Sequence, residues 1–341
     1  MIPLYDKNEV FNVDDLDCMI DLHLHLDGAI SVESARQLAA AQGIDIPEKD
    51  EDLISLLRVS DDCSDLNEFL QKFDFPCSLL QTETGIRMAV KNLLHELKNE
   101  GVMYAEIRFA PQKSTDKGLT QEDAVKAAIE GMKESETDAN LILCCMRGDD
   151  NHNQNIETVK VAEKYLGKGV AAVDLAGAEA LFSTSMFEDV FELALEKGIP
   201  FTIHAGEADG PDSVRKALEF GAVRIGHGLK SMEDKDLFDK LIKEQIPLEL
   251  CPTSNINTAM YNNIADWPLR KLMDAGINIT INTDDPSVEG TSIKNEFRKL
   301  IEFHKIGEKD VKQFLINSVK ASFACEAVKQ KMTERIENRM E

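Results

Sequence analysis

The sequence lacks long apolar runs, paired-cysteine motifs and an excess of basic residues. No uninterrupted apolar stretch is long enough to cross a bilayer, so no membrane-spanning segment is expected. The seven cysteines contain no Cys-x-x-Cys motif, which excludes a structural zinc ribbon, and their odd number does not predict a disulfide framework. Only 38 lysines and arginines stand against 62 acidic residues. The resulting net charge of −24 excludes a nucleic-acid partner, which would need a basic face.

The thiols and the N-terminal residues predict a cytoplasmic protein. Cys144, Cys145 and Cys251 lie in apolar runs, where a free thiol behaves as a small hydrophobic group. Residues 1–15 hold no basic region followed by an apolar one, so no secretory signal is expected. The sequence leaves the oligomeric state open and is compatible with a monomer.

Short apolar runs alternate with helical patterns along most of the 341 residues. Because the runs are mostly apolar rather than alternating, they are typical of strands buried on both faces. The predicted strands are 18–24, 102–109, 141–147, 170–175, 200–203, 223–226, 247–250 and 277–281. Helices are predicted over 122–133, 156–165, 186–196, 213–220, 234–244 and 268–274.

This alternation fits either a closed (β/α)8 barrel or a doubly wound open sheet. Polar residues that can bind a metal end the first, fifth and eighth strands, and an open sheet would place the first and last strands far apart. A barrel makes these strands neighbours and gathers functional groups at their C-terminal ends. We therefore predict an α/β fold, a (β/α)8 TIM barrel in a single domain over residues 1–341.

A long connection follows the first predicted strand. Residues 27–100 carry helical patterns at 32–41, 50–57, 65–75 and 83–100. An insertion of this length over the mouth of the barrel predicts a helical lid. Extra C-terminal helices, over 310–324 and from 326 onward, are expected to close the outside of the barrel.

Three histidine motifs at strand ends can supply metal ligands or proton carriers. His23 and His25 are two residues apart on a strand, so both imidazoles point to the same face. His204 ends the fifth strand, with Glu207 in the turn that follows. His227 lies between two glycines, which permit close backbone approach. Each motif taken alone is also compatible with partnered histidines in a core or a loop.

Asp284 and Asp285 follow the last strand. Adjacent carboxylates repel each other unless a cation or a shared proton compensates, although an Asp-Asp-Pro turn would also explain them. Because four such motifs end separate strands, we predict one metal-dependent hydrolytic site. His95, His152 and His304 are assigned to a helix, a polar loop and a late helical region, with no catalytic role. Glu106 and Arg108 are predicted to form a structural ion pair in the barrel.

Seven segments, in this order along the chain, resemble the adenosine deaminase family of metal-dependent amidohydrolases. They are DLHLHLDGA, YAEIRFAPQ, VDLAGAE, FTIHAGE, RIGHG, LELCPTSN and TINTDDPS. The resemblance implies one Zn²⁺ held by His23, His25, His204 and Asp284. It also implies that Glu207 protonates the purine N1, that His227 orients the attacking water, and that Asp285 bonds to the purine N7 or to the incoming hydroxide.

The resemblance further implies a purine nucleoside as the small-molecule partner. Asp27 would bind the ribose 5′-hydroxyl, and the backbone N–H of Gly177 would bind the purine N3. His25 would also face the substrate, under an apolar cover from Leu66, Phe69, Leu70 and Phe73, a set equally explained by helix packing. Ala178 stands where many relatives have Asp, which leaves fine specificity open.

The implied reaction is the hydrolytic deamination of adenosine, and of 2′-deoxyadenosine, to the inosine nucleoside and ammonia. Two alternatives remain. One is deamination of another 6-aminopurine, such as adenine, a modified adenylate or 5′-methylthioadenosine. Related adenine deaminases tend to carry Glu where this chain has Asp27, so the aspartate favours a nucleoside. The other alternative is a catalytically silent paralogue, which the complete set of candidate ligands, acid and base disfavours.

Overall fold

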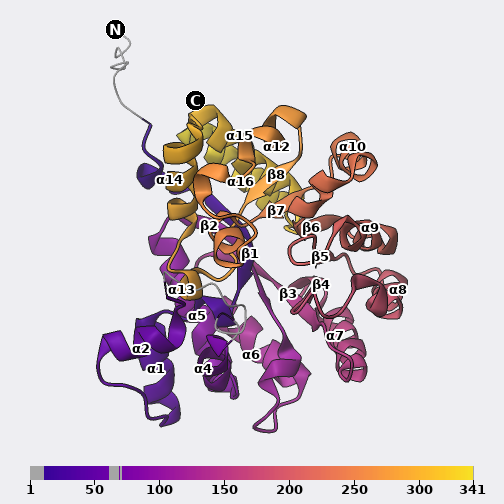
Figure 1. Ribbon diagram of the computed structural model, residues 1–341. Helices are drawn as coiled ribbons and strands as arrows, with labels where there is room; N and C mark the ends of the chain where they lie inside the picture. The colour runs from indigo at the N-terminus through magenta and orange to yellow at the C-terminus, as the bar shows by residue number, and fades with distance from the viewer. Residues whose placement is uncertain (1–10, 61–68, 70, 341) are drawn as a thin grey trace.

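Eight parallel strands form the centre of the protein (Figure 1). The computed structural model describes residues 11–60, 69 and 71–340. Each strand overlaps one predicted run, and the run over 102–109 is matched at both ends. The strands are β1 (Met19–His25), β2 (Val102–Phe109), β3 (Asp138–Met146), β4 (Val170–Ala176), β5 (Thr202–Ala205), β6 (Arg224–His227), β7 (Leu248–Leu250) and β8 (Ile279–Ile281).

The strands close into a ring. β1 to β4 pair in sequence order, as do β5 to β8, and the parallel bridges Val173–Phe201 and Leu24–Asp284 join the two sheets at both seams. At the seam between β1 and β8, the Asp284 N–H donates to the His23 carbonyl (2.8 Å), and the His25 N–H donates to the Asp284 carbonyl (2.8 Å). The predicted barrel is confirmed, and its first and last strands are neighbours.

Helices follow the strands and cover the outside of the barrel. Their ends carry the expected signals: Thr120 forms a capping box with Asp123, and α9 begins at Pro211 and is capped by Gly221, whose φ is 101°. The helices are α6 (Gln121–Lys133), α7 (His152–Tyr165), α8 (Glu188–Glu196), α9 (Pro211–Phe220), α10 (Lys235–Glu244) and α12 (Leu269–Ala275). The assignment of His152 to a loop was wrong, because α7 begins at this residue.

Two short helices were not expected. α11 (Pro252–Asn257) and α13 (Pro286–Glu289) begin directly after β7 and soon after β8. Each has proline at its first position, where the missing N–H would have had no partner within the helix. Proline immediately after a strand end is therefore the signal that could have identified them.

Between β1 and β2 lie α1 (Val32–Gln42), α2 (Asp50–Leu57), α4 (Asp74–Leu79) and α5 (Glu83–Asn99). In Figure 1, α1, α2 and α4 gather at one end of the molecule. The helix predicted over 65–75 lies partly outside the described residues, and its predicted end was wrong. The chain turns at Lys72 and Phe73, and a new helix then accommodates Pro76 in its first turn, where no N–H is needed.

The chain finishes with α14 (Ile293–His304), α15 (Glu308–Ala321) and α16 (Glu326–Arg339). α15 packs against β8 and β1, and α16 packs against α15. These contacts cover the seam where the barrel closes. Within the part of the chain that the structure describes, no helix combines the length and apolar character needed to span a membrane.

A network of buried charges fills the barrel interior. Arg224 on β6 lies 2.7 Å from Glu106 on β2 and 2.6 Å from Glu249 on β7. The guanidinium of Arg224 also stacks 4.0 Å from the ring centre of Phe323. Arg108 contacts Glu249 and Asp174, both at 2.9 Å. Glu106 and Arg108 are therefore both in ion pairs, but not with each other: side by side on one strand face, each reaches a partner across the barrel.

Removing Arg224 should destabilise the barrel. Arg224→Ala leaves the buried Glu106 carboxylate without its cation and removes one of the two arginines that contact Glu249. Breaking a buried ion pair in this way typically costs about 3–5 kcal/mol. The matched control is Arg335→Ala, which breaks a partly exposed contact with Asp17 and should change the free energy of unfolding much less. Denaturant titration followed by circular dichroism measures both, and equal losses would contradict the structural role given to the network.

Candidate metal centre and substrate cavity

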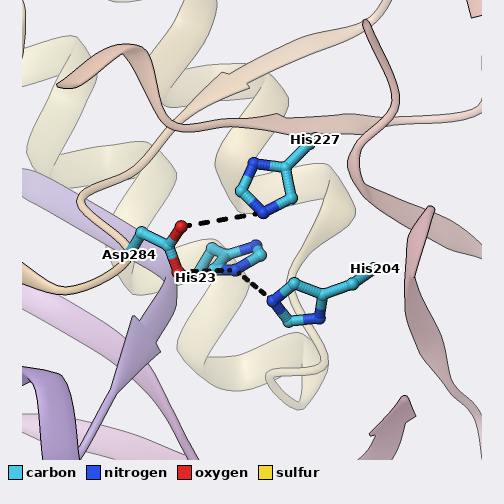
Figure 2. Close-up of side chains that lie close together, drawn as sticks. All are labelled: His23, His204, His227 and Asp284. Atoms are coloured by element: carbon cyan, nitrogen blue, oxygen red, sulfur yellow. Dashed lines mark hydrogen bonds and ion pairs between the residues drawn. The ribbon is translucent and has the colours of Figure 1, made fainter. Parts of the chain in front are cut away.

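Four polar side chains from four strand ends meet inside the mouth of the barrel (Figure 2). His23 Nε2 lies 2.9 Å from His204 Nε2 and 3.2 Å from Asp284 Oδ1. His227 Nε2 lies 3.6 Å from Asp284 Oδ2. The donor atoms of these four residues all lie within 4.8 Å of one another, and all four residues are buried. The cluster could hold a metal ion.

His25 belongs to the same group of donors. Its Nε2 lies 3.2 Å from His204 Nε2 and 3.3 Å from Asp284 Oδ1. The two histidines of β1 therefore point to one face, as their spacing predicts. All four predicted metal ligands, His23, His25, His204 and Asp284, come together, with His227 beside them.

Buried carboxylates behind the imidazoles fix which nitrogen faces the centre. Glu249 Oε2 lies 2.9 Å from His23 Nδ1, and Asp174 Oδ2 lies 2.9 Å from His204 Nδ1. A carboxylate at Nδ1 favours the proton on that nitrogen, so the Nε2 lone pairs of the two rings face each other at 2.9 Å. Two facing lone pairs repel unless a cation lies between them. The donor set therefore fits a metal ion.

Two residues of the cluster have unusual backbone conformations. The φ angles of His227 and Asp284 are 59° and 73°, in the left-handed region that side-chain-bearing residues seldom adopt. Such residues typically cost about 1–3 kcal/mol each and persist where the surrounding structure holds them. Gly226 allows close packing at this point, because a Cβ there would lie only 3.1 Å from His23 Cε1. These backbone conformations point both side chains toward the centre of the cluster.

Glu207 stands beside the cluster in the turn after β5. Its Oε2 lies 3.5 Å from His227 Nε2, and its side chain is 19% exposed. Burial raises the pKa of Glu207; the neighbouring His227 opposes this rise, while the nearby carboxylate of Asp284 adds to it. A carboxyl with a raised pKa can hold a proton and donate it to a bound molecule.

The Asp285 carboxyl packs against Gly28, the residue that follows Asp27. A Cβ at Gly28 would lie 1.8 Å from Asp285 Oδ1, so only glycine leaves room for this carboxyl. Burial, and then the charges of Asp284 and Asp27, raise the pKa of Asp285 well above its usual value. Burial also raises the pKa of Asp27, which accepts a weak hydrogen bond from the Cys77 thiol at 3.7 Å.

A cavity of about 760 Å³ opens over these groups, within the usual range for small-molecule sites. Of the predicted site residues, those lining it are His25, Asp27, Phe69, Phe73, Gly177, His204, Glu207, His227, Asp284 and Asp285. His23 lies beneath the cavity floor. Phe69 and Phe73 pack together with ring centres 5.8 Å apart, and both contact a small apolar cluster with Val59 and Val288. Leu66 and Leu70 lie outside the described residues.

The sequence prediction missed the residues that hold the donors in place. Asp174 and Glu249 support His204 and His23, and Glu179 accepts hydrogen bonds from the turn that carries Glu207. Asn255 lies 3.2 Å from His227 Nδ1. A signal was present for two of them: Asp174 and Glu249 each stand as a lone carboxylate inside an apolar strand, where an unpaired charge would be costly.

Known proteins of one family resemble this chain over nearly its whole length. The adenosine deaminase family model matches residues 19–339. A curated adenosine deaminase from Haemophilus ducreyi is 46% identical over 94% of this chain and 96% of its own. One from Clostridium acetobutylicum is 36% identical over 93% and 96%. The solved structure of an adenine deaminase from Arthrobacter aurescens superposes with a TM-score of 0.83 at 29% identity, covering 94% of this chain and 98% of its own.

Loss of one central imidazole should empty the metal centre. His204→Ala removes the nitrogen that contacts both His23 and His25, so we expect the bound metal to fall from a stoichiometric amount to a small fraction. The control is His304→Ala: this buried imidazole bonds to the Ile264 carbonyl (2.7 Å) outside the cluster. Elemental analysis of the purified, dialysed proteins measures the metal. Full metal content in His204→Ala would contradict the ligand role.

Proposed function

The chain belongs to the adenosine deaminase family, and from this premise we propose that it hydrolyses adenosine to inosine and ammonia, and 2′-deoxyadenosine likewise. The observation that carries the proposal is the meeting, in one cavity, of a metal-binding donor set with a carboxyl of raised pKa. Removal of the 6-amino group needs a water made more acidic and a proton delivered to the ring. The cavity offers residues suited to both.

We propose that the metal is one Zn²⁺, held by His23, His25, His204 and Asp284. Three imidazole nitrogens and one carboxylate oxygen are ligands typical of zinc, and carboxylates behind two of the imidazoles match the usual support of zinc-binding histidines. When bound, zinc would lower the pKa of a coordinated water to about 7.

Glu207 is proposed as the general acid. Attack at C6 disrupts the aromatic ring, so the adjacent N1 must gain a proton as the new bond forms. Burial favours the protonated form of Glu207. Its position at the cavity wall, 3.5 Å from His227, would allow it to donate to a purine edge while His227 takes part on the water side.

His227 is proposed to act on the attacking water, and Asp285 on the purine N7 or the incoming hydroxide. His227 Nε2 lies 3.6 Å from Asp284 Oδ2, within the metal-binding cluster, where it can accept a proton from the attacking water. Asn255 near its Nδ1 steadies the ring. Asp285, with a raised pKa, can donate a hydrogen bond to the purine N7.

The remaining cavity residues are proposed to select a nucleoside. Asp27 would bind the ribose 5′-hydroxyl, and the Gly177 N–H would bind the purine N3; the φ of Gly177 is 104°, a conformation that glycine adopts without strain. Phe69 and Phe73 line the cavity from the insertion between β1 and β2. We propose that this insertion, residues 27–100 of a single domain, acts as a lid.

We also propose that the enzyme works in the cytoplasm. The described cysteines are free thiols, and four of the six are buried. Long-lived thiols are typical of reducing compartments.

Adenosine should be deaminated in a metal-dependent reaction. The change in ultraviolet absorbance on deamination is followed for adenosine, 2′-deoxyadenosine, adenine and 5′-methylthioadenosine. We expect adenosine to give the highest kcat/KM, a chelator to abolish the activity, and added Zn²⁺ to restore it. Equal activity after complete removal of the metal would contradict the proposal, and a clear preference for adenine would move it to another 6-aminopurine.

Glu207→Gln should lose turnover but keep the metal. The amide preserves the shape of the side chain but cannot deliver the proton, and loss of a general acid typically costs about 10²–10⁴-fold in rate. KM should change far less than kcat. Steady-state kinetics and elemental analysis test this prediction, with Glu192→Gln, an exposed glutamate on α8, as the matched control. A kcat near that of the unmodified enzyme would refute the role.

A further inference from the structure

The carboxylate of Glu179 binds the turn that carries Glu207. Its Oε1 accepts from the Gly206 N–H (2.7 Å), and its Oε2 accepts from the N–H groups of Glu207 (3.0 Å), Ala208 (2.7 Å) and Asp209 (3.0 Å). The Ser213 hydroxyl makes a further short hydrogen bond to Oε1. Four successive backbone amides thus converge on one side chain.

This carboxylate is buried and charged. Glu179 is only 3% exposed. Burial alone would raise its pKa, but the hydrogen bond from Ser213, the charge of Arg147 and the backbone hydrogen bonds together lower it. A buried anion held by several hydrogen bonds resists displacement, because each would have to be replaced by one to water. The turn over 206–209 is therefore fixed relative to the loop after β4.

A second set of hydrogen bonds, from Arg147, also holds the loop after β4 in place. Arg147, just beyond β3, donates to the carbonyls of Phe182 (2.7 Å) and His204 (2.6 Å) and to Thr184 Oγ1 (3.0 Å). Thr184 Oγ1 in turn lies 2.7 Å from Ser213 Oγ. The segment from Gly177 to Thr184 is thus tied both to the strand that bears His204 and to the turn that bears Glu207.

Gly177 and Glu207 are proposed above to contact N3 and N1 of the same purine ring. These two atoms are a fixed distance apart, so the groups that bind them must also be held at a fixed separation. Glu179 is two residues from Gly177 in sequence and bonds to the backbone N–H of Glu207. Among the described residues, the Glu179 side chain thus connects the loop that contains Gly177 directly to the turn that contains Glu207.

We propose that Glu179 is a positioning residue, which holds the Glu207 turn against the Gly177 loop at the separation that the purine ring requires. The inference rests on the proposed function, because it acts through Glu207. It assigns Glu179 no contact with the substrate and no contact with the metal.

The test is a double-mutant cycle between Glu179→Gln and Glu207→Gln, with Glu192→Gln as the control. Misplacement of a catalytic group by about 1 Å can cost about 10²-fold, so we expect kcat for adenosine to fall about 10²-fold in Glu179→Gln. KM and metal content should change little. In the Glu207→Gln background the same substitution should have almost no further effect, because the group being positioned is already disabled.

Hydrogen exchange of the amides at 206–209 gives a readout that needs no turnover. Glu179→Gln replaces one acceptor oxygen by an NH₂ group facing backbone donors, so we expect faster exchange at these amides and unchanged exchange in the β strands. If the unmodified protein deaminates no purine, the proposed function fails, while the exchange result still decides whether Glu179 anchors the turn.

Four results would overturn the inference. They are an unchanged kcat in Glu179→Gln, an equal loss of kcat in both backgrounds, loss of the metal, and unchanged exchange at 206–209. If Glu179→Gln does not fold, the same measurements are made on Glu179→Asp. That variant keeps the negative charge beside Arg147 but is one methylene too short to reach all four amides, so the same results apply to it.

Discussion

The buried Arg108 holds the carboxylates that support the histidine cluster. Arg108 on β2 bridges Asp174 on β4 and Glu249 on β7, both at 2.9 Å, and these carboxylates support His204 on β5 and His23 on β1. A guanidinium can bind two carboxylates in a fixed planar geometry. The orientation of the clustered imidazoles therefore depends on the guanidinium of Arg108. Without it, Asp174 would lose its arginine and Glu249 would keep only Arg224, so the support behind both rings would weaken.

Much of the fold and the cluster of donors could be predicted from the sequence, because both depend on local patterns. Apolar runs marked all eight strands, since each strand is buried on both faces. The donors end strands, and parallel strands in a barrel bring those ends together. His23, His25, His204 and Asp284 could thus be placed near one another although some 260 residues separate the first from the last. The turn at Lys72 and Phe73 could not be predicted, because the apolar residues around it keep the spacing of a continuous helix.

The partners of the supporting residues could not be predicted, because the closed barrel determines which strands lie next to each other. Arg108 and Glu106 alternate on one strand and look like a pair, yet each is neutralised from another strand. Glu179 lies two residues after Gly177 in a loop, and nothing near it in sequence shows that it will accept hydrogen bonds from four amides some thirty residues away. The partners of such polar groups are defined only when each strand lies beside its final neighbours. These supporting groups also fix the orientation of the donor side chains.

The seam between β1 and β8 has a consequence for how the living cell makes this protein. The backbone of Asp284 pairs with that of His23 and His25, so the final strand must insert beside the first before the donor set exists. A ribosome-bound chain that has emerged only as far as β7 carries the histidines of the cluster but not Asp284. All four donors could therefore hold a metal ion together only after the chain has been synthesised through Asp284.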